Sequence, residues 1–289
     1  MKILILGSTG EIGHMACKVL SKNHDVSTLM RNNDKLNDVK FFEKILAEPY
    51  CNFIEHFNDF DLVKSKIKKI NPDILINCIG IVKHRKECKK DIPETAYINS
   101  DFPHLLAETC IDSNIKFIHL STDCVFSGGK GNYNESDIPD PTDYYGESKM
   151  LGEVNIPNAL TLRTSFIGPA LFHKTGLFEW TKQQKNKTIN GYKNAIYSGL
   201  TTIAFSKILN QIIEDFPQLE GLFHISSEPI SKFDLIHLLN KKFQLNININ
   251  PDSTFTCDRS LDSTAFRKKT NISIPSWEKM IDELYHYNM

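Results

Sequence analysis

The chain has 289 residues, a formal net charge of -1 and 40% hydrophobic residues, enough for one large domain or two small ones with a sizeable core. This composition is that of an ordinary soluble globular protein and excludes a disordered chain. The near-zero charge argues against a broad basic face for duplex nucleic acid, and no apolar run reaches the roughly 18 residues of a membrane-spanning helix. The N-terminal sequence also lacks the features of a signal peptide. We therefore expect a cytoplasmic protein that binds neither nucleic acid nor membrane.

The 7 cysteines are odd in number and form no Cys-x-x-Cys pair. This argues against a disulfide framework and against a structural zinc site. We expect the thiols to be reduced and mostly structural, and we expect no metal.

Apolar strands alternate with amphipathic helices through the first half of the chain. The pattern predicts strands at Ile3–Leu6, Val26–Met30, Asn52–Phe57, Ile74–Ile79, Phe117–Leu120 and Leu160–Leu162. It predicts helices at Ile12–Leu20, Asp61–Ile70, Pro93–Cys110 and Tyr144–Glu153. Such alternation favours an α/β fold of the Rossmann type, a doubly wound parallel sheet with helices on both faces.

The pattern becomes less regular after about Ile167. Helices are predicted at Gly176–Lys185, Thr201–Phe216, Lys232–Phe243 and Pro275–Tyr287, and a strand at Leu222–Ser226. We expect residues 1–165, with a later contribution from about 200–228, to form the Rossmann domain. Residues 166–199 and 229–289 are expected to form a smaller C-terminal lid over the carboxyl edge of the sheet.

A glycine loop follows the first predicted strand and opens the first predicted helix. Its sequence is Gly7-Ser8-Thr9-Gly10-Glu11-Ile12-Gly13. Glycines at this spacing allow a tight turn, close approach of a pyrophosphate to the backbone, and close packing of the helix on the strand. Because a helix N-terminus also favours an anion, the loop predicts a dinucleotide site rather than a purely structural turn.

The second predicted strand ends at Arg31. An acidic residue there would bind a free ribose 2′-hydroxyl, whereas an arginine favours a 2′-phosphate, so we expect NADPH to be preferred over NADH, with NAD as an alternative. A solvated charge at the end of a strand is the other interpretation of Arg31. Asn58 and Asp59 follow the third strand and fit either an adenine contact or an ordinary Asx turn or helix cap.

Tyr145 and Lys149 share one face of a predicted helix, because positions i and i+4 lie one above the other. A lysine ammonium beside a phenol lowers its pKa, and such a phenol can protonate an alkoxide that forms at a carbonyl. Thr122 stands at the carboxyl end of the fifth strand, where its hydroxyl can bind the same substrate oxygen. The combination predicts carbonyl reduction beside the cofactor.

Four motifs together carry a family resemblance. They are Gly-x-x-Gly-x-x-Gly, Ser-Thr-Asp-x-Val-Phe-Ser-Gly at 121–128, Tyr-Gly-x-Ser-Lys-x-x-Gly-Glu at 145–153 and Leu-Arg-Thr-Ser at 162–165. The set resembles extended short-chain dehydrogenases/reductases and, more narrowly, the dTDP-4-dehydrorhamnose reductase group. The resemblance implies an NADP-binding domain, a substrate-binding lid, and reduction of the C4 ketone of a nucleotide-activated 4-keto-6-deoxy sugar for surface polysaccharide synthesis.

The resemblance also implies roles for individual residues. The residues that match the catalytic triad are Thr122, Tyr145 and Lys149. The expected cofactor contacts are Gly7, Ser8, Thr9, Gly10, Glu11, Ile12, Gly13, Arg31, Asn58, Asp59, Cys78, Ile79, Gly80, Asn99, Ser121, Tyr145, Lys149, Thr164 and Ser165. The expected substrate contacts are Lys83, Thr122, Asp123, Cys124, Val125, Tyr145, Arg163, Asn194 and Arg259.

Some of these positions leave alternatives open. Asn99 matches an asparagine that supports the catalytic lysine, and a capping or solvent-facing side chain fits equally well. The basic residues 83–86 fit a diphosphate contact or a solvated helix start. Arg259 is the expected phosphate contact, because a guanidinium binds phosphate through a two-pronged fork. Residues 190–194 and 198–199 are expected to form pocket loops.

Cys124 departs from the group, which usually has tyrosine after Thr-Asp. A thiol cannot stack or hydrogen-bond as a phenol does, so sugar recognition is expected to differ. Related 4,6-dehydratases carry glutamate there, which argues against dehydration. An epimerase or epimerase-reductase and a non-catalytic NADP-binding regulatory subunit remain alternatives. A homodimer is the default oligomeric state, and Trp180 and Trp277 are expected to pack in the core or at its rim.

Overall fold

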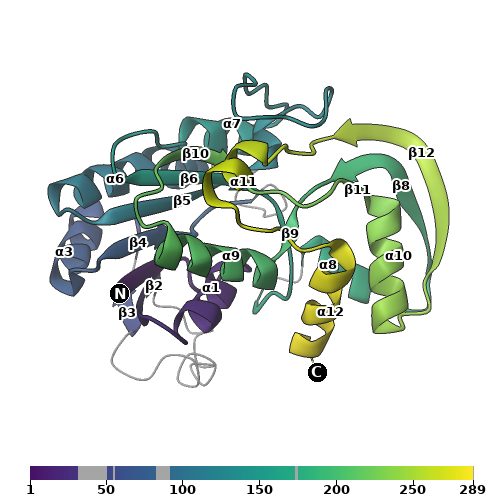
Figure 1. Ribbon diagram of the computed structural model, residues 1–289, viewed down its shortest axis with the longest axis horizontal. Coiled ribbons are helices and arrows are strands. Elements are labelled where there is room, and N and C mark those ends of the chain that lie inside the picture. The colour runs from purple at the N-terminus through teal and green to yellow at the C-terminus, as the bar shows by residue number, and fades with distance from the viewer. Residues whose placement is uncertain (32–50, 55, 83–91, 173–174, 289) are drawn as a thin grey trace.

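The computed structural model describes residues 1–31, 51–54, 56–82, 92–172 and 175–288. A large sheet with helices on both faces forms one side of the molecule, and a smaller sheet forms the other (Figure 1). Within the described residues the large sheet has the order β10-β6-β5-β4-β1-β2-β3, and every neighbouring pair is parallel. Its strands are β1 (Lys2–Leu6), β2 (Asp25–Arg31), β3 (Cys51–Ile54), β4 (Ile74–Asn77), β5 (Lys116–Thr122), β6 (Ala159–Thr164) and β10 (Gly221–His224). The predicted Rossmann-type fold is confirmed.

The helices beside this sheet bury two separate cores. They are α1 (Gly13–Leu20), α3 (Phe60–Ile70), α6 (Phe102–Asp112), α7 (Tyr144–Leu151) and α9 (Thr202–Asp215). In β1, Ile3 and Ile5 belong to the core that includes residues of α1 and α9, whereas Leu4 and Leu6 belong to the core of α3 and α6. Successive side chains of a strand point to opposite faces, so a continuous apolar run is what a doubly covered central strand requires.

The predicted helix Pro93–Cys110 contains a π-helical turn. It begins with α5 (Ile92–Ala96), continues through the π turn η2 (Tyr97–Asp101) and ends as α6. A π turn holds one more residue than an α turn, and such turns often occur at functional sites. Asn99 and Ser100 in this turn are both buried, and the Ser100 hydroxyl donates to the carbonyl of Ser148 in α7 at 2.9 Å.

The smaller sheet contains strands that the sequence pattern did not predict. β8 (Thr188–Tyr197) pairs in parallel with β12 (Asn248–Asp258) and antiparallel with β11 (Ile230–Ser231). Residues 190–194 therefore lie within a strand, and their expected assignment to a pocket loop is wrong. The helix α10 (Lys232–Phe243) packs against β8, as Figure 1 shows.

The remaining elements lie outside these two sheets. They are the 3-10 turn η3 (Asp123–Val125), β7 (Phe166–Ile167), α8 (Leu177–Lys182), β9 (Leu200–Thr201), α11 (Thr264–Thr270) and α12 (Trp277–Asn288). Two of them, β7 and β9, pair with each other. Several predicted strands end elsewhere than expected. Among them, β5 continues to Thr122, and β4 stops at Asn77. No helix among the described residues combines the length and the apolar character that crossing a membrane would need.

Candidate active site

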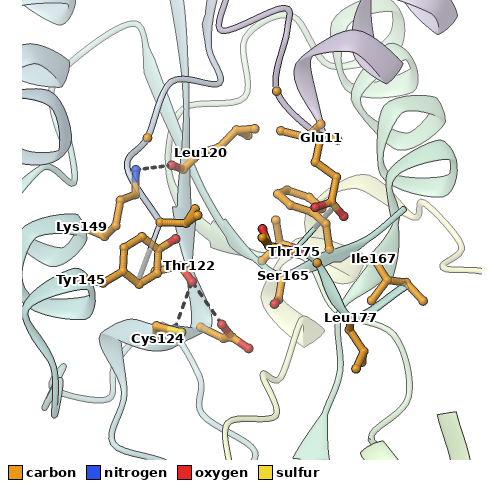
Figure 2. A pocket seen from close by; sticks show the side chains of 18 of the residues that line it. Glu11, Leu120, Thr122, Cys124, Tyr145, Lys149, Ser165, Ile167, Thr175 and Leu177 are labelled. Carbon is orange, nitrogen blue, oxygen red and sulfur yellow. Dashed lines mark hydrogen bonds between the residues drawn. The ribbon is translucent and has the colours of Figure 1, made fainter. Parts of the chain in front are cut away.

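A cavity of about 440 Å³ opens at the carboxyl ends of the central strands. Its walls come from the glycine loop, the segment after β4, the end of β5, the first turns of α7, and residues of β8 and β12. Figure 2 shows Tyr145 and Lys149 on one side of this cavity and Glu11 on the other. The glycine loop, Thr122 and the Tyr145–Lys149 pair, which are expected to act together, therefore line the same cavity.

The glycine loop has the close-packed backbone that a dinucleotide site needs. Gly7 has a φ of +79°, and a Cβ there would lie 2.8 Å from the carbonyl carbon of Cys78. A Cβ on Gly13 would lie 2.1 Å from the carbonyl oxygen of Gly7. Residues 9–12 line the cavity, while Ser8 is buried and its hydroxyl has no partner among the described residues. This loop fits the phosphates of a dinucleotide, which bind backbone N–H groups at such turns.

Thr122 is fixed at the end of β5 by its own neighbours. Its hydroxyl donates to Oδ1 of Asp123 at 3.1 Å and accepts from the backbone N–H of Cys124 at 3.2 Å (Figure 2). The Tyr145 side chain also hydrogen-bonds Thr122. Two hydroxyl groups suited to bind one substrate oxygen are thus adjacent at the cavity wall.

Burial raises the pKa of the Tyr145 phenol above its ordinary value. The adjacent Cys124 raises it further, and the hydrogen bond to Thr122 opposes the shift. The expected lowering of this pKa by Lys149 is therefore wrong for the described structure. The reason is that desolvation penalises the phenolate more than these hydrogen bonds stabilise it. The phenol is accordingly protonated at neutral pH and can act as a proton donor.

Lys149 is buried at 4% exposure with its ammonium group held by the strand behind it. Nζ donates to the carbonyl of Leu120 at 2.8 Å and lies 3.4 Å from Nε2 of His119. Burial lowers the pKa of Lys149 to about 8, although Glu153 and Cys78 act in the opposite direction. The lysine therefore loses its charge at a lower pH than an ordinary lysine does.

His119 and Asn77 support Lys149 and were missed by the sequence analysis. Both are fully buried, and Nδ2 of Asn77 lies 3.2 Å from Nδ1 of His119. Burial, and then the charge of Lys149, lower the pKa of His119 well below its usual range, so the ring is neutral. A polar residue within each of two apolar strands, Ile74–Asn77 and Lys116–Thr122, was the signal available in the sequence.

Asn99 connects the segment after β4 to α7. Its Oδ1 accepts from the N–H of Ile81 at 2.9 Å, and Nδ2 donates to the carbonyl of Ile81 and to the hydroxyl of Ser148, both at 3.0 Å. The capping and solvent-facing alternatives are excluded because the side chain is fully buried. Asn99 contacts the residue next to Lys149 rather than Lys149 itself.

Two expected substrate contacts lie in the protein interior instead. Arg163 is 4% exposed and forms an ion pair with Glu153, in which Nη2 and Oε2 are 2.7 Å apart. Val125 is fully buried in a small core with Phe126 and Tyr133. Neither Arg163 nor Val125 lines the cavity, so the structure gives both a packing role.

Arg259 reaches the cavity from the segment after β12. Its Nε donates to the carbonyl of Phe126 at 2.8 Å, Nη1 lies 3.6 Å from the Cys124 sulfur, and Nη2 donates to Thr142 at 3.2 Å. Both Arg259 and Cys124 line the cavity. These contacts hold the guanidinium group in position. The expected phosphate contact of Arg259 stays a prediction.

Other expected contacts lie farther from this space. Asp59 caps α3 by accepting from the N–H of Leu62 at 3.0 Å, and Asn58 beside it is exposed. Arg31 is exposed at the end of β2, opposite Ile54 of β3. Asn194 is exposed in β8, donates to the carbonyl of Ser253 at 3.2 Å and does not line the cavity.

The structure also places the remaining residues that the sequence analysis named. The expected contacts that line the cavity are Cys78, Ile79, Gly80, Ser121, Asp123, Thr164 and Ser165. Lys83 and the rest of 83–86 fall outside the described residues. Trp277 is buried and its indole N–H donates to the carbonyl of Glu228 at 2.8 Å, whereas Trp180 is 36% exposed.

The C-terminal part of the chain contributes residues that the sequence analysis did not single out. Tyr197, Lys232, Phe255 and Cys257 line the cavity. Phe255 is 48% exposed and stacks at a tilt against Tyr192, with ring centroids 5.3 Å apart. Among the described residues, no group of three or more His, Cys, Asp and Glu side chains could hold a metal ion.

Comparison with known proteins places this geometry in context. The sequence profile of the family described as RmlD substrate binding domain matches residues 1–288. A dTDP-4-dehydrorhamnose reductase of Aggregatibacter actinomycetemcomitans is 28% identical over 247 residues, which cover 81% of this chain and 76% of the relative. Methionine adenosyltransferase 2 subunit beta of Danio rerio is 27% identical over 265 residues, covering 84% of this chain and 74% of the relative.

A solved structure has the same fold. The dTDP-4-dehydrorhamnose reductase of Bacillus anthracis, crystallised in complex with NADP, superposes with a TM-score of 0.79. The sequences are 20% identical, and the alignment covers 100% of both chains. At that identity the likeness speaks for the fold alone.

Proposed function

Because the chain belongs to the RmlD substrate binding domain family, we propose that it is an NADPH-dependent reductase acting on the C4 ketone of a nucleotide-activated 4-keto-6-deoxy sugar. The observation that carries the proposal is the shared cavity: Thr122, Tyr145 and Lys149 line the same space as the glycine loop. The A. actinomycetemcomitans relative, a dTDP-4-dehydrorhamnose reductase by name, supports the substrate class. The product would serve as a precursor for surface polysaccharide.

The described residues fit a dinucleotide cofactor. The N–H groups of residues 9–12 would hold its diphosphate, and Lys149 would hold the ribose next to the nicotinamide. Arg31 at the end of β2 would bind the 2′-phosphate, which is the basis for proposing NADPH over NADH. When bound, the cofactor supplies the hydride that reduces the carbonyl carbon.

Tyr145 protonates the oxygen of the reduced carbonyl. Its phenol is neutral at physiological pH, as an ordinary tyrosine is, and burial raises its pKa further, so it holds the proton that a nascent alkoxide takes up. Thr122 hydrogen-bonds Tyr145 and offers a second polar contact to the same oxygen. Asp123 and the N–H of Cys124 keep the Thr122 hydroxyl in place, so the oxygen site is built before the substrate arrives.

Arg259 and Cys124 form the sugar side of the proposed site. The guanidinium already contacts the Cys124 sulfur, Phe126 and Thr142, so it does not have to lose side-chain freedom when it meets a phosphate. Where Cys124 stands, related reductases usually carry a tyrosine, and the smaller thiol leaves the sugar fewer hydrogen-bonding partners.

The direct test is a panel of dTDP-, UDP-, GDP- and CDP-linked 4-keto-6-deoxy sugars, followed by the loss of NADPH absorbance. We expect stoichiometric NADPH oxidation with at least one of them, and NMR of the product should show a hydroxyl at C4. Inversion at C3 or C5 without net NADPH consumption would instead indicate an epimerase.

A non-catalytic regulatory subunit is the second candidate, favoured by the similarity to methionine adenosyltransferase 2 subunit beta. The two functions differ in what they require of Tyr145. If the chain acts as a binding partner, Tyr145→Phe preserves its biological effect, because the phenyl ring still fills the same space. If the chain is a reductase, the same variant abolishes that effect.

A further inference from the structure

Glu11 lies at the contact between the glycine loop and the start of the lid. Its carboxylate accepts a hydrogen bond from the backbone N–H of Gly168, just after β7. Its Oε2 also packs on Gly176, where a Cβ would lie only 2.8 Å away. Oε1 is buried without a hydrogen-bond partner in the part of the chain that the structure describes. One side chain therefore connects the proposed phosphate-binding loop to two points of the opposite wall.

The charged groups around Glu11 disfavour its ionised form. Glu179 of α8 is 5% exposed and adds negative charge, while Lys182 is 3.7 Å from Glu179. The phenol of Tyr197 in β8 interacts with Glu11 electrostatically. On the α1 side, Nδ1 of His14 lies 2.8 Å from the carbonyl of Gly10. No ion pair joins Glu11 to a cation within the described ranges.

These surroundings keep the side chain uncharged at neutral pH. Burial raises the pKa of Glu11 to about 8, Glu179 adds to the rise, and the Gly168 N–H opposes it. The neighbouring N–H groups of the loop are those that would hold an anionic diphosphate. A second negative charge on the loop itself would repel that diphosphate in a poorly solvated space, where like charges interact strongly.

We propose that Glu11 is a positioning residue for the cofactor: its uncharged carboxyl group holds the glycine loop against Gly168 and Gly176, and its ionisation weakens the binding of NADPH. The inference rests on the proposed function only in taking NADPH as the cofactor. It requires no particular sugar. It gives the third variable position of the glycine motif a role beyond its backbone N–H.

The first test compares NADPH binding by the full-length wild type and Glu11→Gln at pH values from 6.5 to 9.5, followed by cofactor fluorescence. The amide keeps the shape of the carboxyl group and cannot ionise. We expect equal dissociation constants near pH 6.5. Above pH 8 the dissociation constant of the wild type should rise faster than that of the variant. The difference is at most about tenfold per pH unit, which is the limit for the release of one proton. Superimposable curves would overturn the proposal.

Lys149 titrates in the same range, since its pKa is also about 8, but it does so in both proteins. The difference between the two curves therefore reports Glu11 alone. Glu179→Gln provides a further arm. Removing that negative charge should lower the pKa of Glu11, because less repulsion opposes its ionisation, so the dissociation constant for NADPH should begin to rise at a lower pH than in the wild type. If the dissociation constant of Glu179→Gln begins to rise at the same pH and as steeply as that of the wild type, Glu179 does not influence the ionisation of Glu11.

A cofactor-free measurement separates this inference from the proposed reaction. Because the folded-state pKa is raised, the unfolded chain releases the Glu11 proton first, so the wild type loses stability from about pH 5 to pH 8. In urea unfolding, the free energy of unfolding of Glu11→Gln should increase relative to that of the wild type over that range, and the difference should stay constant at higher pH. A difference between the two free energies of unfolding that does not change with pH would contradict a buried, uncharged carboxyl group at Glu11. A chain that shows both pH effects yet reduces no sugar would refute the proposed function alone.

Discussion

The guanidinium group of Arg163 forms a two-pronged ion pair with Glu153, in which Nε and Nη2 lie 2.7 Å from different carboxylate oxygens. The Ser121 hydroxyl donates to the same carboxylate at 2.7 Å. Glu153 follows α7, Arg163 lies in β6 and Ser121 in β5. The pair therefore fixes the end of the Tyr145–Lys149 helix segment to the two strands whose carboxyl ends form the site.

Glu153→Ala should destabilise the fold strongly. It leaves the buried Arg163 charge without its partner, and breaking a buried pair in this way typically costs about 3–5 kcal/mol. Urea denaturation measures the loss. In Glu153→Ala combined with Arg163→Met, no unpaired charge remains, so we expect part of the stability to return. A double variant no more stable than the single one would show that Arg163 finds another partner.

Tyr145→Phe should lower kcat by about 10²- to 10⁴-fold, the usual contribution of a positioned general acid. Binding of NADPH should change little, because the phenyl ring preserves packing at the cavity wall. The adjacent Tyr144→Phe is the matched control: it removes a hydroxyl that donates to the carbonyl of Ile92 at 3.0 Å. Absorbance assays and fluorescence titration measure the two quantities. Weak NADPH binding by Tyr145→Phe, or equal kcat losses in both variants, would contradict the assignment.

Arg31→Asp should weaken NADPH binding about 10- to 100-fold while leaving NADH binding nearly unchanged. The estimate is the strength of a hydrogen bond to a charged group, about 1.5–3 kcal/mol. Titration with both cofactors provides the measurement. Similar losses for NADPH and NADH would show that Arg31 is a solvated charge away from the 2′-phosphate.

Lys149→Met should stabilise the protein most at neutral pH. The folded-state pKa of about 8 lies below the ordinary value of 10.5, so the stability linked to Lys149 is complete above pH 10.5 and is lost as the pH falls through 8. The advantage of the variant should therefore shrink by up to about 1.4 kcal/mol per pH unit between pH 8 and pH 10. Unfolding curves across this range measure it, and a constant difference would argue against a desolvated ammonium.

The sequence predicted the parts of the site that are encoded locally. The glycine loop and the Tyr145–Lys149 pair each lie within a few consecutive residues, so their spacing alone determines their geometry. Asn99 was identified by position, but its true partners, Ile81 and Ser148, are distant in sequence. Arg163 was assigned to the substrate because a buried partner for its charge cannot be read from its own motif.

The small sheet was missed for a different reason. β8 has mostly exposed or half-exposed residues, and its partner β12 lies beyond two intervening helices, α9 and α10. Without a regular alternation of apolar residues, residues 188–197 resemble a loop, and only the pairing with residues 248–258 makes them a strand. The pKa of Tyr145 was predicted in the wrong direction because desolvation depends on the whole cavity wall.

The π turn at Tyr97–Asp101 makes the spacing of this stretch intolerant of length changes. The turn brings Asn99 so close to the end of α7 that a Cβ on Gly152 would lie 1.9 Å from the Asn99 carbonyl oxygen. Deleting one residue here would convert the π turn to regular α-helical winding and remove the widening that places Asn99 and Ser100 against α7. Homologues that gain or lose a residue between 97 and 101 are thus expected to have rebuilt the contact behind the catalytic helix, and engineered chimaeras should keep both segments from one parent.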